Sequence, residues 1–279
     1  MLKVLKSGFY TTIQDSGRFG YRNKGVPISG AMDMFSVSRL NTLLENDKNA
    51  AVLEITMTGP TLLFKKNTYI ALAGAWLSPT INNEPIDNYK VYKIVEGDIL
   101  SYGRLEKGFR SYLAVKNGFN TPSVLGSQSQ YSPITGNKCL AEFEELDFDE
   151  FNFFKPKISE LKMDTYLDFN FLEVHKGPEF GMLSDKQLKT LFSKKFAISK
   201  ENNRMAYQLE ETIGVHAYSL LTSATQPGTV QLTPAGKLIV LMKDGQTTGG
   251  YPRILQLTNK AIPILAQKKE GDKLTLKLI

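Results

Sequence analysis

The 279-residue sequence has a single cysteine, Cys139, and only two histidines, His175 and His216. One cysteine excludes an internal disulfide framework and a zinc site built from several thiolates. Neither histidine lies in an H-E-x-x-H or similar arrangement, so each is expected to be a surface or packing residue rather than a metal ligand. The sequence therefore predicts no metal site.

Two widespread catalytic motifs are also absent. The sequence has no G-x-x-x-x-G-K-[ST] segment, which excludes a Walker-type phosphate-binding loop. It has no G-x-S-x-G segment either, so nothing supports the nucleophile elbow of an α/β-hydrolase.

Long apolar runs are missing as well. The N-terminal MLKVLKSGFY lacks the continuous apolar region of a signal peptide. The longest uncharged run, 212–236, contains Gly, Pro, His and many hydroxyls, so it is not a spanning helix. The sequence therefore predicts a cytoplasmic protein without a membrane partner.

Acidic residues are in modest deficit, with 34 Lys and Arg against 28 Asp and Glu, which gives a net charge of +6. A basic balance can indicate a nucleic-acid or anionic-membrane partner. Here the lysines are scattered in ones and twos, as at Lys65-Lys66 and Lys194-Lys195, without aromatic residues interleaved. A solvated basic surface is the favoured interpretation, and no nucleic-acid partner is predicted.

The sequence is rich in short β-type segments. Six are enriched in β-branched and aromatic residues and bounded by Gly, Pro, Asn or Asp: 55–64, 68–75, 90–100, 109–115, 228–234 and 237–242. This spacing favours barrels or sandwiches over βαβ units. Two helices are expected, one capped by Asp33 over residues 34–44 and one that begins at Ser184 with a capping box to Gln187.

The length allows one large β domain or two of ordinary size. We expect an N-terminal β subdomain over residues 1–138, an acidic, Phe-rich connection over 139–170 and a C-terminal β subdomain over 171–279. Within the connection, the segment 141–157 is expected to have a solvated acidic face and aromatics packed against a barrel. Docking of a partner protein is the alternative for this segment.

Charged residues and glycines are concentrated in TTIQDSGRFGYRNKGVPISGAMD, residues 11–33. Glycine-rich loops let the backbone approach a ligand, and an arginine fork binds a carboxylate or phosphate through two parallel hydrogen bonds. A carboxylate in such a cluster orients an arginine or handles a proton. Each of these residues, taken singly, is equally well explained as a solvated charge in an irregular connection. The density of charged residues and glycines in one segment is what favours a functional site. The candidates are Gln14, Asp15, Arg18, Arg22 and Asp33.

A second cluster, DGQTTGGYPRI (244–254), follows the apolar run LIVLM (238–242). Adjacent glycines after a strand indicate either a sharp turn or a close approach to a ligand. Consecutive backbone N–H groups there would form an anion-binding nest, whereas composition alone favours a hairpin turn. The candidates are Lys243 as a point charge, the hydroxyls of Thr247 and Thr248, and the backbone of Gly249 and Gly250.

A third segment, SKENNRMAYQLE (199–210), contains Arg204 after an Asn-Asn pair. This arginine is a lesser candidate for the site, since a strand preceded by an Asn turn explains it equally well.

Six segments together resemble the biotin-dependent carboxyltransferase-like family, which includes the C subunit of prokaryotic 5-oxoprolinase, also described as allophanate hydrolase subunit 2 or the KipA type. In the order expected for that family, they are TTIQDSGRFGYRNKGVPISGAMD, LEITMTGPTLLF, GFRSYLAVKNGF, VLGSQSQY, NNRMAYQL and DGQTTGGYPRI. The resemblance spans nearly the whole chain.

The resemblance implies a mostly β architecture of two cyclophilin-like β-barrel subdomains with few short helices. It also implies a hetero-oligomer with the KipI-like B subunit and the A subunit of 5-oxoprolinase, and ATP as co-substrate bound with the B subunit. The implied reaction opens 5-oxo-L-proline to L-glutamate, by phosphorylation of the lactam oxygen followed by attack of water. The chain alone is expected to be inactive. It is also expected to carry no covalent biotin, because Met242-Lys243 lacks the second methionine of an attachment site.

For the site, the resemblance adds Gln246 and Tyr251 to the candidates. The expected catalytic residues are Asp15, Arg18, Asp33 and Lys243; the expected substrate- and anion-binding residues are Gln14, Arg22, Arg204, Gln246, Thr247, Thr248, Gly249, Gly250 and Tyr251. Arg18 and Lys243 would neutralise phosphate or carboxylate charge, and the two aspartates would orient the substrate amide or the arginines.

The sequence departs from the family pattern in two places. The acidic segment 141–157 stands where relatives have a compact Gly-Asp turn, and Lys243-Asp244-Gly245 precedes Gln246 where Asp-Arg is expected. A lysine supplies a less directional charge than an arginine. Two alternatives stay open: a carboxyltransferase subunit that moves a carboxyl group from carboxybiotin to a urea-like amide, and a non-enzymatic KipA-type regulatory binding protein.

Overall fold

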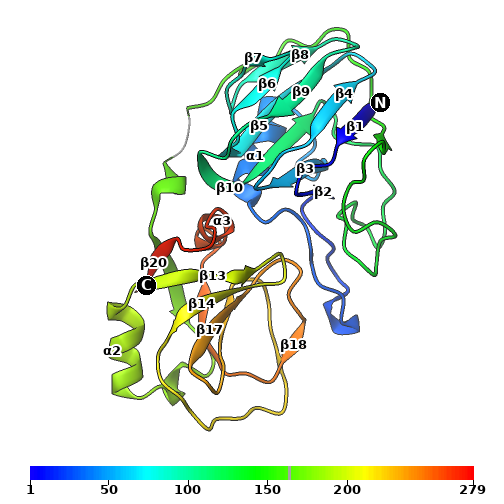
Figure 1. Ribbon diagram of the computed structural model, residues 1–279. Helices are drawn as coiled ribbons and strands as arrows, with labels where there is room; N and C mark the ends of the chain where they lie inside the picture. The colour runs from blue at the N-terminus through cyan, green and yellow to red at the C-terminus, as the bar shows by residue number, and fades with distance from the viewer. Residues whose placement is uncertain (163–164) are drawn as a thin grey trace. The chain divides into compact units, whose positions relative to one another are not determined.

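The computed structural model of the protein describes residues 1–162 and 165–279, and it divides into two compact units (Figure 1). The first unit comprises residues 1–18 and 29–167, and the second comprises residues 19–28 and 168–279. The main division therefore falls at 167/168, close to the expected 170/171. The segment 139–167 folds with the first unit rather than as a separate connection, and residues 19–28 fold with the second.

The first unit consists of two sheets with an apolar core. The six-stranded sheet has the order β11 (Glu145–Leu146), β1 (Leu2–Lys6), β4 (Thr61–Phe64), β9 (Ile99–Tyr102), β6 (Pro79–Ile81) and β7 (Glu84–Pro85). The five-stranded sheet has the order β2 (Tyr10–Gln14), β3 (Val52–Thr56), β10 (Lys107–Val115), β5 (Thr68–Trp76) and β8 (Val91–Ile94). Helix α1 (Met34–Leu43) packs on β5 and β10, where Val37 and Leu40 join a second apolar cluster.

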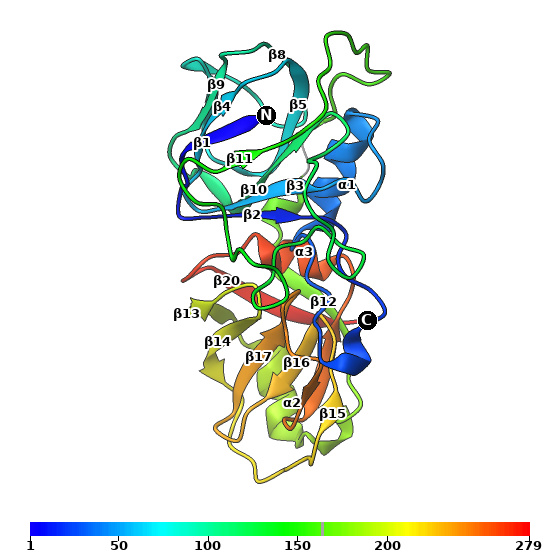
Figure 2. The same ribbon diagram turned by 90° about the vertical axis from the view of Figure 1, so that its right-hand side faces the viewer.

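The second unit is a closed barrel of seven strands (Figure 2). Its order is β12 (Phe171–Lys176), β19 (Arg253–Leu257), β16 (Thr229–Leu232), β17 (Lys237–Leu241), β14 (Ala206–Thr212), β13 (Phe196–Asn202) and β20 (Lys273–Leu278). A small ribbon pairs β15 (Ser223–Ala224) with β18 (Thr248–Gly249). Helices α2 (Asp185–Ser193) and α3 (Ala261–Ala266) and the 3-10 turns η1 (Arg22–Lys24), η2 (Tyr166–Asp168) and η3 (Phe180–Met182) complete the elements of the described residues.

The expectation of a mostly β chain with few helices is confirmed, and so are both predicted helix starts. Asp33 accepts a hydrogen bond from Ser36 N at 3.0 Å, and Ser184 and Gln187 form the predicted capping box. Helix α3 was not predicted, because it contains Pro263 and its N-cap, Lys260, makes no side-chain cap bond.

Two predicted strands are each divided by a turn. The segment 55–64 covers the end of β3 and all of β4, separated by a turn in which Met57 has a left-handed φ of 64°. The segment 90–100 covers β8 and the start of β9, separated by a turn in which Gly97 has a φ of 96° and Asp98 accepts a hydrogen bond from Val95 N at 2.8 Å. The sequence marks both turns, with Gly59-Pro60 in the first segment and Gly97-Asp98 in the second.

The acidic segment 141–157 packs only partly as expected, because Phe143 and Phe153 are 68% and 82% exposed. Phe148 is fully buried and meets Phe64 edge to face at 6.1 Å between ring centroids. The acidic side chains face outward, where Glu145 pairs with Lys65 and Asp147 with Lys66. No helix of the described residues has the length and apolar character needed to span a membrane.

Candidate anion-binding site

The first predicted cluster is divided between the two units. Gln14, Asp15, Arg18 and Asp33 belong to the first unit, whereas Arg22 belongs to the second. The residues of each unit are therefore described with the neighbours that they contact.

Asp15 organises a loop at the end of β2. Its Oδ1 accepts hydrogen bonds from Gly17 N at 2.8 Å, Ser127 Oγ at 2.7 Å and Ser129 Oγ at 2.5 Å. Its Oδ2 accepts one from Gln128 N at 2.7 Å. Four donors hold this buried carboxylate, so its visible role is to attach the segment 127–129 to β2.

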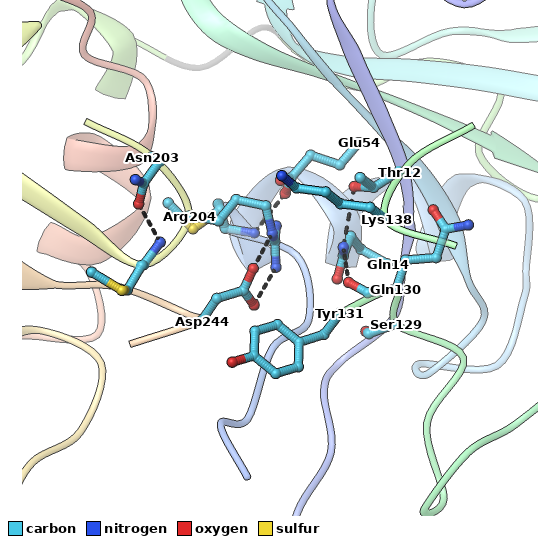
Figure 3. A network of polar contacts seen from close by, with 12 residues as sticks. Thr12, Gln14, Glu54, Ser129, Gln130, Tyr131, Lys138, Asn203, Arg204 and Asp244 are labelled. Carbon is cyan, nitrogen blue, oxygen red and sulfur yellow. Dashed lines mark hydrogen bonds and ion pairs between the residues drawn. The ribbon is translucent and has the colours of Figure 1, made fainter. Parts of the chain in front are cut away.

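Arg18 and Gln14 bind the same segment. The fully buried guanidinium of Arg18 donates to the carbonyls of Val124 at 3.0 Å and Ser129 at 2.8 Å. The amide of Gln14 donates to Thr12 Oγ1 at 3.1 Å and to Gln130 O at 3.2 Å (Figure 3). The motif at 11–33 and VLGSQSQY (124–131) therefore interlock through buried polar bonds. The catalytic roles expected for Asp15 and Arg18 stay predictions.

Asp33 is the cap of α1 and also binds the 3-10 turn η2. Its Oδ2 accepts hydrogen bonds from Ser36 Oγ at 2.9 Å and from Tyr166 OH at 2.5 Å. Burial, reinforced by the nearby Asp33 charge, raises the pKa of Tyr166, so the phenol remains a donor. The catalytic role expected for Asp33 likewise stays a prediction.

A buried charged pair escaped the sequence analysis. Glu54 on β3 and Arg110 on β10 are 1% and 2% exposed, with Arg110 Nε 3.8 Å from Glu54 Oε1. Glu54 Oε2 also accepts hydrogen bonds from Tyr112 OH at 2.9 Å and Met32 N at 2.7 Å. The signal was present in the sequence: one charged residue stands within each of the apolar strands VLEIT and FRSYLAV.

In the second unit, Arg204 forms a bidentate ion pair with Asp244 (Figure 3). Its Nε lies 2.8 Å from Asp244 Oδ2 and its Nη2 lies 3.1 Å from Oδ1. The pair attaches the start of DGQTTGGYPRI to the start of β14. Because Asp244 already accepts two hydrogen bonds from its guanidinium, Arg204 is not an open binding group for another anion.

The Gly249-Gly250 pair lies at a close packing contact. Thr248 and Gly249 form β18, paired with β15, so this segment is neither a hairpin turn nor a left-handed nest, and neither glycine has a positive φ. A Cβ on Gly249 would lie 2.6 Å from the amide nitrogen of Gln231, which is 1% exposed. Close approach to a buried side chain therefore accounts for Gly249.

The rest of this motif holds the ribbon. Thr225 N donates to Thr247 O at 3.0 Å, and Thr225 Oγ1 donates to Gln246 O at 2.5 Å. Thr248 and Tyr251 are exposed beside it. Their expected contribution to anion binding stays a prediction.

Two neighbouring cavities of the second unit form the feature that we call the basic groove. They have volumes of about 430 and 440 Å³ and share Arg22, Gln226 and Gln256. The first is further lined by Lys176 and Arg253, and the second by His175 and Lys243. Within the described residues, no aspartate or glutamate lines either cavity. The surroundings therefore favour an anion.

The cations of the basic groove are not equivalent. Arg253 is bound by Glu179, with Nη2 2.7 Å from Oε1 and Nε 3.0 Å from Oε2, and its Nη1 donates to Ala224 O at 2.7 Å. Hydrogen bonds from Arg253 lower the pKa of Glu179. By contrast, Arg22 and Lys176 form no ion pair with any described residue. Burial lowers the pKa of Arg22, a sign that its guanidinium has lost part of its hydration.

The structure thus brings two predicted residues, Arg22 and Lys243, to one surface. The sequence analysis missed Lys176, Gln226 and Gln256, which line the same groove. Lys176 stands just before a Gly-Pro-Glu turn whose glutamate binds Arg253, and that turn was the available signal.

Comparison with known proteins places the chain in a family. Residues 24–278 match the family model described as "Carboxyltransferase domain, subdomain A and B", and the chain belongs to that family. It is 34% identical over 277 residues to the C subunit of 5-oxoprolinase from Escherichia coli (strain K12), an alignment that covers 98% of this chain and 89% of the relative. The C subunit of 5-oxoprolinase from Haemophilus influenzae is 29% identical over 279 residues, with the same coverage.

Among solved structures, the Kluyveromyces lactis urea carboxylase superposes with a TM-score of 0.88 at 25% identity. The match covers 100% of this chain but only 27% of that chain. The carboxyltransferase-type fold of this chain therefore also occurs as part of a much longer carboxylase.

Proposed function

We propose that this chain is the C subunit of an ATP-dependent 5-oxoprolinase complex, which converts 5-oxo-L-proline to L-glutamate. The observation that carries the proposal is the 34% identity to the C subunit of a 5-oxoprolinase over 98% of the chain. The resemblance to urea carboxylase is lower and covers a small part of that protein. Carboxyl transfer is therefore the second candidate.

In this proposal the chain acts with the B and A subunits and supplies part of the substrate and phosphate site. The lactam oxygen takes the γ-phosphoryl group of ATP and ADP leaves. One water then adds to the activated carbon and the C–N bond breaks, which frees the amine and leaves an acyl phosphate. A second water hydrolyses that acyl phosphate to the carboxylate of glutamate and free phosphate. Both 5-oxoproline and ATP are anions, and the basic groove offers cations that suit either one. Binding and charge neutralisation are the contributions that we assign to this chain.

The test is reconstitution of the chain with its candidate A and B subunits. ADP release and glutamate formation are measured together, with 5-oxo-L-proline or with 2-pyrrolidinone, which keeps the lactam but lacks the carboxylate. We expect ADP release that depends on 5-oxo-L-proline, equimolar glutamate, and loss of both products when this chain is omitted.

Other outcomes decide between the alternatives. A stable complex without 5-oxoproline-dependent ADP release contradicts the proposal. In that case, transfer of labelled carboxyl from carboxybiotin to urea would identify a carboxyltransferase subunit. Undiminished activity after omission of this chain would show that it is not part of the catalytic unit.

A further inference from the structure

We propose that the basic groove of the second unit binds an oxyanion group, a carboxylate or a phosphate, between Arg22 and Lys176. The choice of ligands to test rests on the proposed function, because 5-oxoproline carries a carboxylate and ATP carries phosphates. Binding itself is a property of this chain and is measured without the other subunits.

The charge distribution of the groove is the first argument. Arg22, Lys176 and Lys243 line two cavities in which no described residue supplies a lining carboxylate. Like charges that face one cavity repel each other, and a bound anion relieves that repulsion. A surface with this arrangement therefore favours an anionic ligand.

The unequal engagement of the cations is the second argument. Arg253 is neutralised by Glu179 and anchored to Ala224, so it forms a fixed wall of the groove. Arg22 is half-buried and makes neither an ion pair nor a side-chain hydrogen bond within the described residues. A partly dehydrated guanidinium with unused donors is suited to a carboxylate or phosphate oxygen.

The neutral lining sets the class of ligand. The amides of Gln226 and Gln256 lie where the two cavities meet, and Gln256 is held by Thr229 at 3.0 Å and Pro227 at 2.9 Å. Gln226 is exposed and can bind a neutral polar group. The second cavity adds the apolar side chains of Phe19 and Ile28. An anion with a compact, partly apolar body and one further polar group fits these neighbours.

The experiment titrates the purified full chain with 5-oxo-L-proline, ATP and inorganic phosphate by calorimetry, with 2-pyrrolidinone as the uncharged control. We expect at least one of the three anions to bind with a Kd below about 1 mM, with affinity that falls as KCl rises. Binding of 5-oxoproline alone assigns the groove to a carboxylate. Binding of ATP or phosphate alone assigns it to a phosphoryl group.

Matched variants test the position of the site. Arg22→Gln and Lys176→Gln are each expected to weaken binding about ten-fold, ~1.4 kcal/mol. Lys24→Gln, in the same 3-10 turn but outside the lining, and Lys277→Gln, on the strand beside β12, are expected to change Kd less than about two-fold. Melting curves check that all four variants fold.

Two results would overturn the proposal. One is that no anion binds to the folded chain, and the other is that both groove variants keep the wild-type affinity. If the reconstituted complex has 5-oxoprolinase activity but the purified chain binds none of the anions in the groove, only this inference is refuted. If the groove binds anions but the complex lacks 5-oxoprolinase activity, only the proposed function is refuted.

Discussion

Arg253 carries a charge in the wall of the basic groove, yet Glu179 occupies both ends of its guanidinium fork. The two side chains are 19% and 12% exposed, so solvent screens this pair less than a surface pair. The pair therefore stabilises the turn after β12 and leaves the anion-binding role to its neighbours.

This pair predicts a pH-dependent stability. The pKa of Glu179 is lowered in the folded chain, so its contribution is present above the ordinary glutamate pKa of 4.5 and is lost as the pH falls through the native pKa. Glu179→Gln is expected to cost about 1–3 kcal/mol at neutral pH. Thermal melts from pH 7 to pH 3 should show a constant deficit relative to wild type down to about pH 5. The deficit should then shrink in acid, and one that stays constant to pH 3 would contradict the linkage.

At Gly249, the sequence indicated two possible explanations but did not identify the residue that the glycine contacts. The Gly-Gly pair indicated a turn or a close approach, and the structure identifies the close approach through Gln231. Gln231 lies 18 positions earlier on another strand, so no local pattern connects the two residues. Contacts of this kind arise from tertiary packing and lie beyond what spacing reveals.

At the scale of elements, local capping chemistry was sufficient to predict where the two capped helices begin. Ser184 and Gln187 satisfy each other's backbone donors, a bond pattern that four consecutive residues determine by themselves. Leu191 of the same helix is fully buried, so α2 joins the second unit through its apolar face. Helix α3 lacks such a cap, and its buried side chains rather than a local signal account for its position.

The capping box of α2 predicts a measurable stability effect. Ser184→Ala removes the acceptor of Gln187 N, and it is expected to lower the free energy of unfolding by about 1 kcal/mol. Urea denaturation followed by circular dichroism measures the change. Ser193→Ala is the matched control, because that hydroxyl donates only to Lys189 O within the last turn; it should change stability by less than ~0.5 kcal/mol. Equal costs for the two variants would show that the box contributes nothing.

The candidate site was less predictable than the elements. The motif at 11–33 was correctly identified as dense in polar groups, but its residues serve two units, which only the three-dimensional arrangement reveals. Asp15 and Arg18 form buried bonds to the segment 124–130, and Arg22 is the one candidate of this motif that lines the basic groove. Lys176 had only a weak sequence signal, the Gly-Pro-Glu turn that follows it, because an exposed lysine at a strand end is common.

For the whole molecule, local sequence patterns do not predict that residues 19–28 belong to the second unit while the residues on both sides belong to the first. These residues leave the first unit after Arg18, join the second unit, and the chain returns at Ser29. The second unit thus obtains Arg22 from a remote part of the sequence. A fragment that lacks residues 168–279 therefore lacks the rest of the unit with which this segment folds.

Limited trypsin digestion of the full chain and of fragment 1–167 tests this arrangement. Proteolysis requires local unfolding, so cleavage after Arg22 or Lys24 is expected to be at least about ten-fold faster in the fragment. Lys138, an exposed first-unit residue, is the internal reference and should be cut at similar rates in both. Mass spectrometry assigns the cut sites, and circular dichroism verifies that the fragment keeps its strands. Equal rates at Arg22 in a folded fragment would mean that residues 19–28 owe their order to the first unit.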